Sequence, residues 1–155
     1  MARARRPCFD NTNAAGGRLV VSDGEQLTYS ANGEVLSRKH TDPARSWQYT
    51  WNAAGFLMAA RRGDGVILHF AYDGIGRRIS KRVRYPSGES EATSFYWDGE
   101  EIAHEVRVRR AAGKATTEER THLPHPNGTE PFAQSAWAPP GAARTWELVI
   151  DGPVA

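Results

Sequence analysis

The sequence FAYDGIGRRISK at residues 70–81 decides the fold of this chain, because its central pattern recurs on both sides. Within it Tyr72 is followed at once by Asp73, and Gly76 stands four residues after the aromatic. This pattern predicts a strand, a tight turn and a return strand. We expect the Asp73 carboxylate to accept hydrogen bonds from turn amides, and Gly76 to adopt the positive φ that a hairpin corner often requires.

The same spacing of aromatic residue and glycine occurs twice upstream, at Tyr29 and at Trp51. These two residues stand 22 positions apart, and Trp51 stands 21 positions before Tyr72. A fourth copy at Trp97 follows after 25 residues and has its glycine moved forward. Periods in this range indicate stacked supersecondary units. The structural motif is predicted to comprise Tyr29, Asn32, Gly33, Trp51, Asn52, Gly55, Tyr72, Asp73, Gly76, Trp97, Asp98 and Gly99. The pair Asn32-Gly33 is a dipeptide favoured in type I′ turns.

Alternation of apolar and polar residues predicts strands between these turns. It is clearest at residues 47–51, where three aromatic residues alternate with Gln48 and Thr50. In residues 102–109, Val106 and Val108 can pack on one face while two arginines point to the other. The predicted fold is therefore all-β, built from consecutive antiparallel hairpins.

Composition divides the chain into three predicted parts. Residues 1–15 form a flexible basic tail, residues 16–110 hold the hairpin repeats, and residues 111–155 begin with a long polar hairpin loop at 111–119. The Pro-rich stretch 123–143 is predicted to form neither a helix nor a central strand. It is expected to run over the sheet, anchored by Phe132 and Trp137.

Charge and motifs exclude several classes of protein. The 20 basic and 18 acidic residues give a formal charge of +2, which by itself selects neither nucleic acid nor membrane as a partner. Cys8 is the single cysteine, so no disulfide can form within the chain. No apolar stretch is long enough to span a membrane, and the basic start lacks the apolar region of a signal peptide. Since no nucleophile elbow, phosphate loop or zinc-protease motif occurs, we expect no catalytic residue, metal site or cofactor.

The repeats resemble the tyrosine-aspartate (YD) repeats of the Rhs family, which also occur in insecticidal toxin-complex shells and in teneurins. The best matches are YDGIGRR at residues 72–78 and FYWDG at residues 95–99, and residues 122–134 look like the lead-in to the Rhs-associated core. The resemblance covers roughly residues 16 to 151. It implies a non-enzymatic fragment of a β-sheet strip that spirals into a hollow shell around a C-terminal polymorphic toxin, used in interbacterial competition. The implied partners are the remaining shell repeats, a neighbouring Rhs chain and the toxin cargo. The implied location is outside the cell or at its surface, or the cytoplasm for an unexported fragment.

A second hypothesis is a module that binds carbohydrate or another cell-surface component. Exposed aromatic and basic residues on strands can form such a surface, and the candidates are Trp47, Tyr49, Arg107 and Arg109. The alternative interpretation of the arginines is a solvated strand face, because surface strands commonly carry charge.

Overall fold

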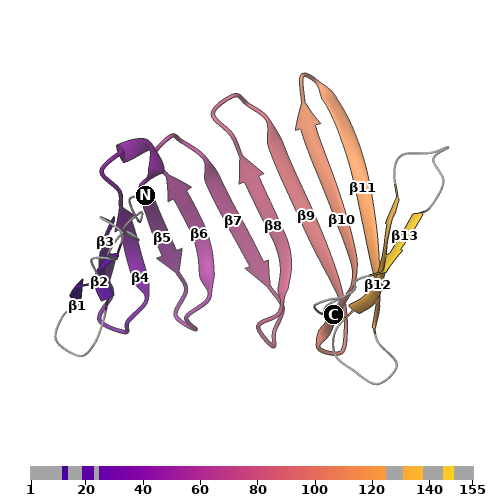
Figure 1. Ribbon diagram of the computed structural model, residues 1–155, viewed down its shortest axis with the longest axis horizontal. Helices are drawn as coiled ribbons and strands as arrows, with labels where there is room; N and C mark the ends of the chain where they lie inside the picture. The colour runs from indigo at the N-terminus through magenta and orange to yellow at the C-terminus, as the bar shows by residue number, and fades with distance from the viewer. Residues whose placement is uncertain (1–11, 14–18, 23–24, 125–130, 138–144, 149–155) are drawn as a thin grey trace, which may run out of the picture. The chain divides into compact units, whose positions relative to one another are not determined.

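The computed structural model describes residues 12–13, 19–22, 25–124, 131–137 and 145–148, with the side chains of residues 20–21 and 25–122 (Figure 1). These residues form β-strands and one short 3-10 helix, η1, and they contain no α-helix. The predicted all-β class is confirmed. In chain order the elements are β1 (Thr12–Asn13), β2 (Leu19–Ser22), β3 (Glu25–Tyr29), β4 (Val35–Lys39), η1 (Pro43–Arg45), β5 (Trp47–Trp51), β6 (Leu57–Arg62), β7 (Ile67–Tyr72), β8 (Arg78–Arg84), β9 (Ser90–Asp98), β10 (Glu101–Ala111), β11 (Lys114–Pro124), β12 (Pro131–Trp137) and β13 (Thr145–Leu148).

The chain divides into two compact units, residues 1–67 and residues 68–155. Within each unit the strands lie in the order of the sequence, and each pairs with the next (Figure 1). The pairings from β1 to β6 and from β8 to β13 are antiparallel. This succession of hairpins is the arrangement that the repeated turn pattern predicted.

Neither unit has a layered core among its described residues. The substantial contacts between elements join strands that are neighbours in the chain. Ala60 and Val66 are the buried apolar residues, and no described side chain is completely buried. Large apolar side chains such as Tyr96 and Ile75 are exposed, at 55% and 77% of their surface. A sheet normally buries at least one face against another layer. Because no second layer formed by the described residues packs on these strands, most of their apolar side chains are only partly covered.

Strand β5 shows the predicted period of two. Trp47, Tyr49 and Trp51 are partly buried, whereas Gln48 and Thr50 are exposed. One face of this strand is therefore aromatic and the other polar.

The predicted long loop at residues 111–119 is wrong. β10 continues to Ala111, and β11 begins at Lys114. Ala112 and Gly113 between them have φ values of 49° and 73°, as both central residues of a type I′ turn require. Because this turn matches the twist of the flanking strands, the polar residues after it continue the ladder directly.

The Pro-rich stretch also differs from the prediction. β12 pairs with β11 on one side and β13 on the other, so it is a central strand. Pro131 is its first residue and no other proline lies within it, and a first position tolerates the missing N–H. The expected anchoring by Phe132 and Trp137 concerns side chains outside the described set.

Two predicted segments lie partly outside the described residues. Of the basic tail at residues 1–15, the structure describes Thr12–Asn13, which form strand β1 instead of tail. The lead-in at residues 122–134 is described up to Pro124 and again from Pro131.

Candidate functional site

Among the described residues, five hairpin loops share one pattern of backbone hydrogen bonds. In each, the first N–H donates to the carbonyl of the fifth residue, and the fourth N–H donates to the carbonyl of the first, at 2.8–3.1 Å. The fourth residue is always a glycine, with φ between 80° and 98°. This is a three-residue connection in which a type I turn is followed by a left-handed glycine. The loops are residues 30–34, 52–56, 62–66, 73–77 and 85–89.

Asp73 and Asn52 have the same role at the first position of their loops. Asp73 Oδ1 accepts hydrogen bonds from the backbone N–H groups of Ile75 and Arg77, at 3.1 and 2.9 Å. Asn52 Oδ1 accepts the two corresponding bonds, at 3.0 and 2.9 Å. The side-chain oxygen, whether from a carboxylate or an amide, thus satisfies two turn donors.

The first copy of the motif differs from its predicted form. Ser30, not Asn32, follows Tyr29 at the position of Asp73, and Ser30 Oγ accepts from the Glu34 N–H at 3.2 Å. Gly33 has a φ of 98° and Asn32 is not among the described residues with positive φ, so the loop is not type I′. The dipeptide Asn32-Gly33 therefore predicted the wrong turn type. The four-residue spacing from Tyr29 to Gly33 locates the loop correctly.

Two of the five loops were missed as copies because they lack the aromatic-acid signature. Arg62 and Tyr85 hold their first positions, and Gly65 and Gly88 their fourth positions. In both loops the glycine stands three residues after the first position, and this spacing was the available signal. The copy at Trp97 is different again, since Asp98 pairs with Glu101 across a two-residue turn in which Gly99 has a φ of 58°.

Arg77 joins two turns of the second unit. Its Nε donates to Asp73 Oδ2 at 2.7 Å, and its Nη1 donates to the carbonyl of Gly99. The guanidinium also lies 5.8 Å from the centre of the Trp97 ring, within reach of a cation–π interaction. The hydrogen bond from Arg77 holds the pKa of Asp73 below its ordinary value, and two backbone donors add to this effect.

Trp51 and Trp97 have equivalent hydrogen bonds. Trp51 Nε1 donates to the carbonyl of Val35 at 2.8 Å, and Trp97 Nε1 donates to the carbonyl of Arg78 at 2.9 Å. Val35 and Arg78 each begin the strand that precedes the tryptophan's own strand. These two tryptophans of the motif therefore each fasten their own strand to the preceding one.

The candidate binding residues lie in different units. Trp47 and Tyr49 stack with ring centres 6.3 Å apart and planes 9° apart, and burial raises the pKa of Tyr49. Arg107 lies 3.8 Å from Glu118. Arg109 lies 3.1 Å from Glu89, and hydrogen bonding to that carboxylate raises the pKa of Arg109. Both arginines are thus paired with acids, which favours the interpretation of a solvated strand face.

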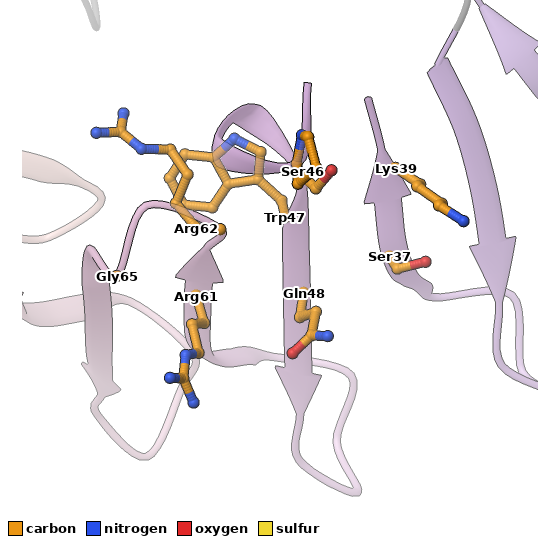
Figure 2. A pocket seen from close by; sticks show the side chains of 10 residues that line it. Ser37, Lys39, Ser46, Trp47, Gln48, Arg61, Arg62 and Gly65 are labelled. Carbon is orange, nitrogen blue, oxygen red and sulfur yellow. The ribbon is translucent and has the colours of Figure 1, made fainter. Parts of the chain in front are cut away.

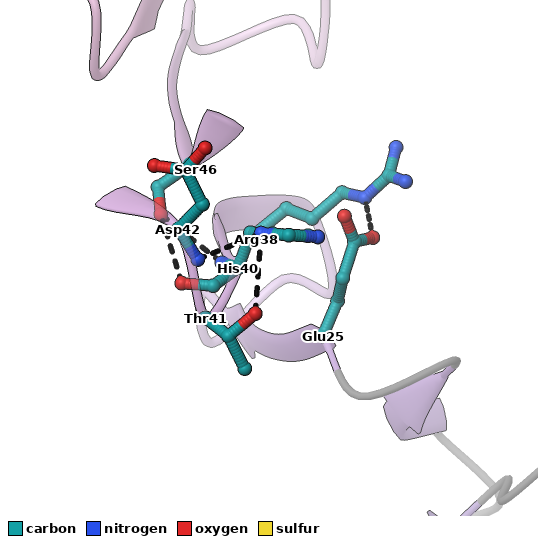
Figure 3. Close-up of polar contacts among 6 residues, drawn as sticks. All are labelled: Glu25, Arg38, His40, Thr41, Asp42 and Ser46. Carbon is teal, nitrogen blue, oxygen red and sulfur yellow. Dashed lines mark hydrogen bonds and ion pairs between the residues drawn. The ribbon is translucent and has the colours of Figure 1, made fainter. Parts of the chain in front are cut away.

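The connection between β4 and β5 is held by short polar contacts (Figure 3). His40 Nδ1 accepts from the Asp42 N–H at 2.8 Å, and Asp42 Oδ1 accepts from the Ala44 N–H at 2.9 Å, which caps η1. Ser46 Oγ accepts from the His40 N–H at 3.0 Å. Arg38 of β4 forms an ion pair with Glu25, which is 7% exposed.

The loop after β6 docks on this connection and borders an open pocket of about 560 Å³ (Figure 2). The N–H of Gly63 donates to the carbonyl of Ser46 at 2.8 Å, and the N–H of Asp64 donates to the carbonyl of Ala44 at 3.1 Å. The pocket is lined by Ser37, Lys39, Pro43, Ser46, Trp47, Gln48, Arg61, Arg62, Gly63 and Gly65.

Two histidines make polar contacts across the β10–β11 ladder. His122 Nε2 lies 3.1 Å from Glu105 Oε1, and His104 Nδ1 lies 3.0 Å from Thr121 Oγ1. The described residues contain no cluster of three or more histidine, cysteine, aspartate or glutamate side chains placed to hold a metal ion. Across the same described ranges, no helix has the length and apolarity needed to cross a membrane.

Two curated proteins from Dickeya dadantii (strain 3937) are similar to this chain. One, named "Probable deoxyribonuclease RhsB", is 31% identical over 102 residues, which are 64% of this chain and 7% of the relative. The matched segment is therefore similar to part of an Rhs protein. A second Rhs protein, "Probable deoxyribonuclease RhsA", is 30% identical over 102 residues with the same shares. No family model matches the chain. The chain thus spans about 7% of the length of the Rhs proteins that it matches.

Proposed function

We propose that this chain is a non-enzymatic structural section of an Rhs β-shell. The observation that carries the proposal is the combination of hairpins in chain order with apolar side chains that stay partly exposed. In repeat architectures each unit buries its apolar face only against neighbouring repeats. The remaining Rhs repeats, from the same polypeptide or a neighbouring chain, are therefore the first expected partners.

The motif residues support a structural role. Asp73 and Asn52 satisfy amides of their own loops, and Arg77 binds a neighbouring turn. Trp51 and Trp97 bind strand carbonyls. Since their polar groups are engaged within the fold, these residues serve to repeat one backbone geometry.

Enclosure of a toxin is the finer part of the proposal. It is supported by the resemblance of residues 122–134 to an Rhs core lead-in and by the deoxyribonuclease names of the two relatives. In this view any nuclease activity belongs to enclosed cargo, the shell acts outside the producing cell, and delivery serves competition between bacteria.

Co-expression with the neighbouring Rhs reading frames tests enclosure. The toxin segment should co-purify with this chain and resist added protease until the assembly is unfolded. A toxin that is cleaved equally fast with and without this chain would contradict enclosure.

Circular dichroism and size-exclusion chromatography test the structural module itself. We expect a β-rich spectrum, and loss of exposed apolar surface, measured by dye binding, when the flanking repeats are supplied. A helix-rich monomer, or dye binding that does not change with the repeats, would contradict a shell section.

A further inference from the structure

We propose that the outer edge of β11 between Lys114 and Glu118 binds a linear peptide segment as an added antiparallel strand. The segment carries a basic residue at its first position and an acidic residue at its fifth. The site lies within the second unit, and its argument does not depend on the shell proposal. It uses the strand pairing, the direction of the main-chain hydrogen bonds and the charges of this edge.

This part of β11 is unpaired on one side among the described strands. Its inner side pairs with β10 residue by residue as far as the turn. On its outer side the ladder with β12 begins at Glu119, which stands opposite Trp137 (Figure 1). The residues from Lys114 to Glu118 are all exposed. An exposed and unpaired edge of this kind binds extended peptides through main-chain hydrogen bonds.

Two other occupants of this edge fit poorly. A direct continuation of β12 would place Pro139 opposite Thr117, and proline has no N–H to donate. A folded second copy would pair edge to edge with Thr116 opposite itself. Its Trp137 would then fall in line with Lys114, at the place that the β10–β11 turn occupies. A linear segment, which brings no neighbouring strand with it, avoids this overlap.

The register of the β10–β11 hairpin determines which main-chain groups point outward. Ala111 and Lys114 flank the two-residue turn and stand opposite each other, so they exchange hydrogen bonds within the hairpin. Along an antiparallel ladder the direction of these bonds alternates from one residue to the next. Ala115 and Thr117 therefore direct their N–H and C=O groups outward, whereas Thr116 directs its groups to β10. Since each outward residue offers one donor and one acceptor, an added strand can form four hydrogen bonds here.

The charges of the edge determine the direction of the segment. Lys114 and Glu118 lie on one face of β11, with Thr116 between them. In an antiparallel partner the first residue stands opposite Glu118 and the fifth opposite Lys114, and opposite charges stabilise such pairs. Glu118 Oε2 also lies 3.8 Å from Arg107 Nη1, but 67% of the Glu118 side chain is exposed, so it can pair with a second cation. The edge therefore favours a segment that begins with a basic residue and ends with an acid.

A nuclear magnetic resonance titration of the full 155-residue chain tests the proposal with two peptides. The matching peptide is acetyl-Lys-Val-Thr-Val-Glu-amide, and the control peptide has lysine and glutamate exchanged. We expect the matching peptide to shift the amide signals of Ala115 and Thr117 and to slow their hydrogen exchange. The control peptide should bind about fivefold more weakly, because both cross-strand charge pairs become repulsive.

Methylation of single peptide nitrogens tests the hydrogen bonds without a change in the protein. The second and fourth residues of the matching peptide face Thr117 and Ala115. N-methylation of either should therefore reduce the affinity about tenfold. The N–H of the third residue points away from β11, so its N-methylation should change the affinity by less than about twofold.

Exchange of the two charges in the protein tests the preferred direction. Lys114→Glu with Glu118→Lys should reverse the preference, so that the control peptide binds more tightly than the matching one. Arg82→Glu with Glu100→Lys makes the same exchange at exposed positions elsewhere in the second unit and should leave the preference unchanged. Circular dichroism verifies that both variants are folded.

Four results would overturn the proposal. They are the absence of binding at about 10 mM peptide, equal affinity for the two peptides, equal loss from methylation of the second and third residues, and an unchanged preference in the Lys114→Glu, Glu118→Lys variant. Slower exchange at Ala115 and Thr117 in concentrated chain without peptide would also overturn it, since it would assign the edge to a second copy. If the variant does not fold, the peptide comparisons still decide, because they use the unaltered chain.

Discussion

Arg77 donates a hydrogen bond from Nε to Asp73 Oδ2 at 2.7 Å, while its Nη1 binds the carbonyl of Gly99. One side chain therefore closes its own loop and fastens it to the next turn at the same end of the strands. The aromatic-acid pattern, which is local in the sequence, thus produces a contact between residues 22 positions apart.

Replacement of Asp73 separates the two functions of its carboxylate. Asp73→Asn should keep the amide hydrogen bonds, as Asn52 does, and lose only the ion pair with Arg77. Asp73→Ala loses both sets of contacts. We expect the melting temperature to fall in the order wild type, Asn, Ala, measured by circular dichroism. Equal melting temperatures for the two variants would show that the amide bonds contribute nothing.

The pH dependence of stability should report the same ion pair. The hydrogen bond from Arg77 places the folded pKa of Asp73 below its ordinary value of 3.8, so the stability it contributes is present above that value. This stability is lost as the pH falls through the lower folded pKa. Melting temperatures measured from about pH 7 down to about pH 2.5 should therefore fall below about pH 4, and less steeply in Asp73→Asn. Parallel curves for the two proteins would contradict the assignment.

Gly88 and Gly74 form a matched test of backbone conformation. A Cβ at either position would meet no atom within 4 Å, but Gly88 alone of the two has a positive φ, of 85°. Gly88→Ala should lower the free energy of unfolding by about 1–2 kcal/mol, the cost of a left-handed alanine. Gly74→Ala should change it by less than about 0.5 kcal/mol. Urea denaturation measures both, and equal effects would exclude strain at Gly88 as the cause.

Gly63 tests the docking of the loop after β6 on the β4–β5 connection. A Cβ at this position would lie 1.8 Å from the carbonyl oxygen of Pro43, which belongs to backbone and cannot simply rotate away. We expect Gly63→Ala to lower the free energy of unfolding by about 1–3 kcal/mol, the usual cost of overpacking. Hydrogen exchange at the Gly63 and Asp64 amides should also accelerate. Unchanged protection of both amides would contradict the docking.

Trp51→Phe tests the hydrogen bond to the first residue of β4. The change removes the Nε1 donor that lies 2.8 Å from the Val35 carbonyl and should cost about 1 kcal/mol or more. Thr50→Ala, on the exposed side of the same strand, should cost less than about 0.5 kcal/mol. Chemical denaturation gives both values, and a smaller loss for Trp51→Phe than for Thr50→Ala would contradict the proposed fastening.

Much of the fold followed from short-range pattern. Alternation at residues 47–51 predicted β5, and the spacing of Tyr72, Asp73 and Gly76 predicted a loop that the structure shows in full. These inferences succeed because strand alternation and turn geometry depend on a few adjacent residues. The two wrong predictions, a type I′ turn at Asn32-Gly33 and a loop at residues 111–119, have the same origin. One rested on a single dipeptide and the other on polar composition, and neither took account of which residues pair across the two strands.

The sequence by itself determined the all-β class, the succession of hairpins and the hydrogen bonds from Asn52 and Asp73 to their own loop amides. Each of these depends on residues that are close together in the sequence. Only the tertiary structure decided that Arg107 and Arg109 face acids, that Arg77 reaches Gly99, and that Lys39, Gln48 and Arg61 border one pocket. Those relationships depend on strand register. A shift of one residue exchanges the two faces of a strand, and no local pattern specifies which residue of the next strand stands opposite.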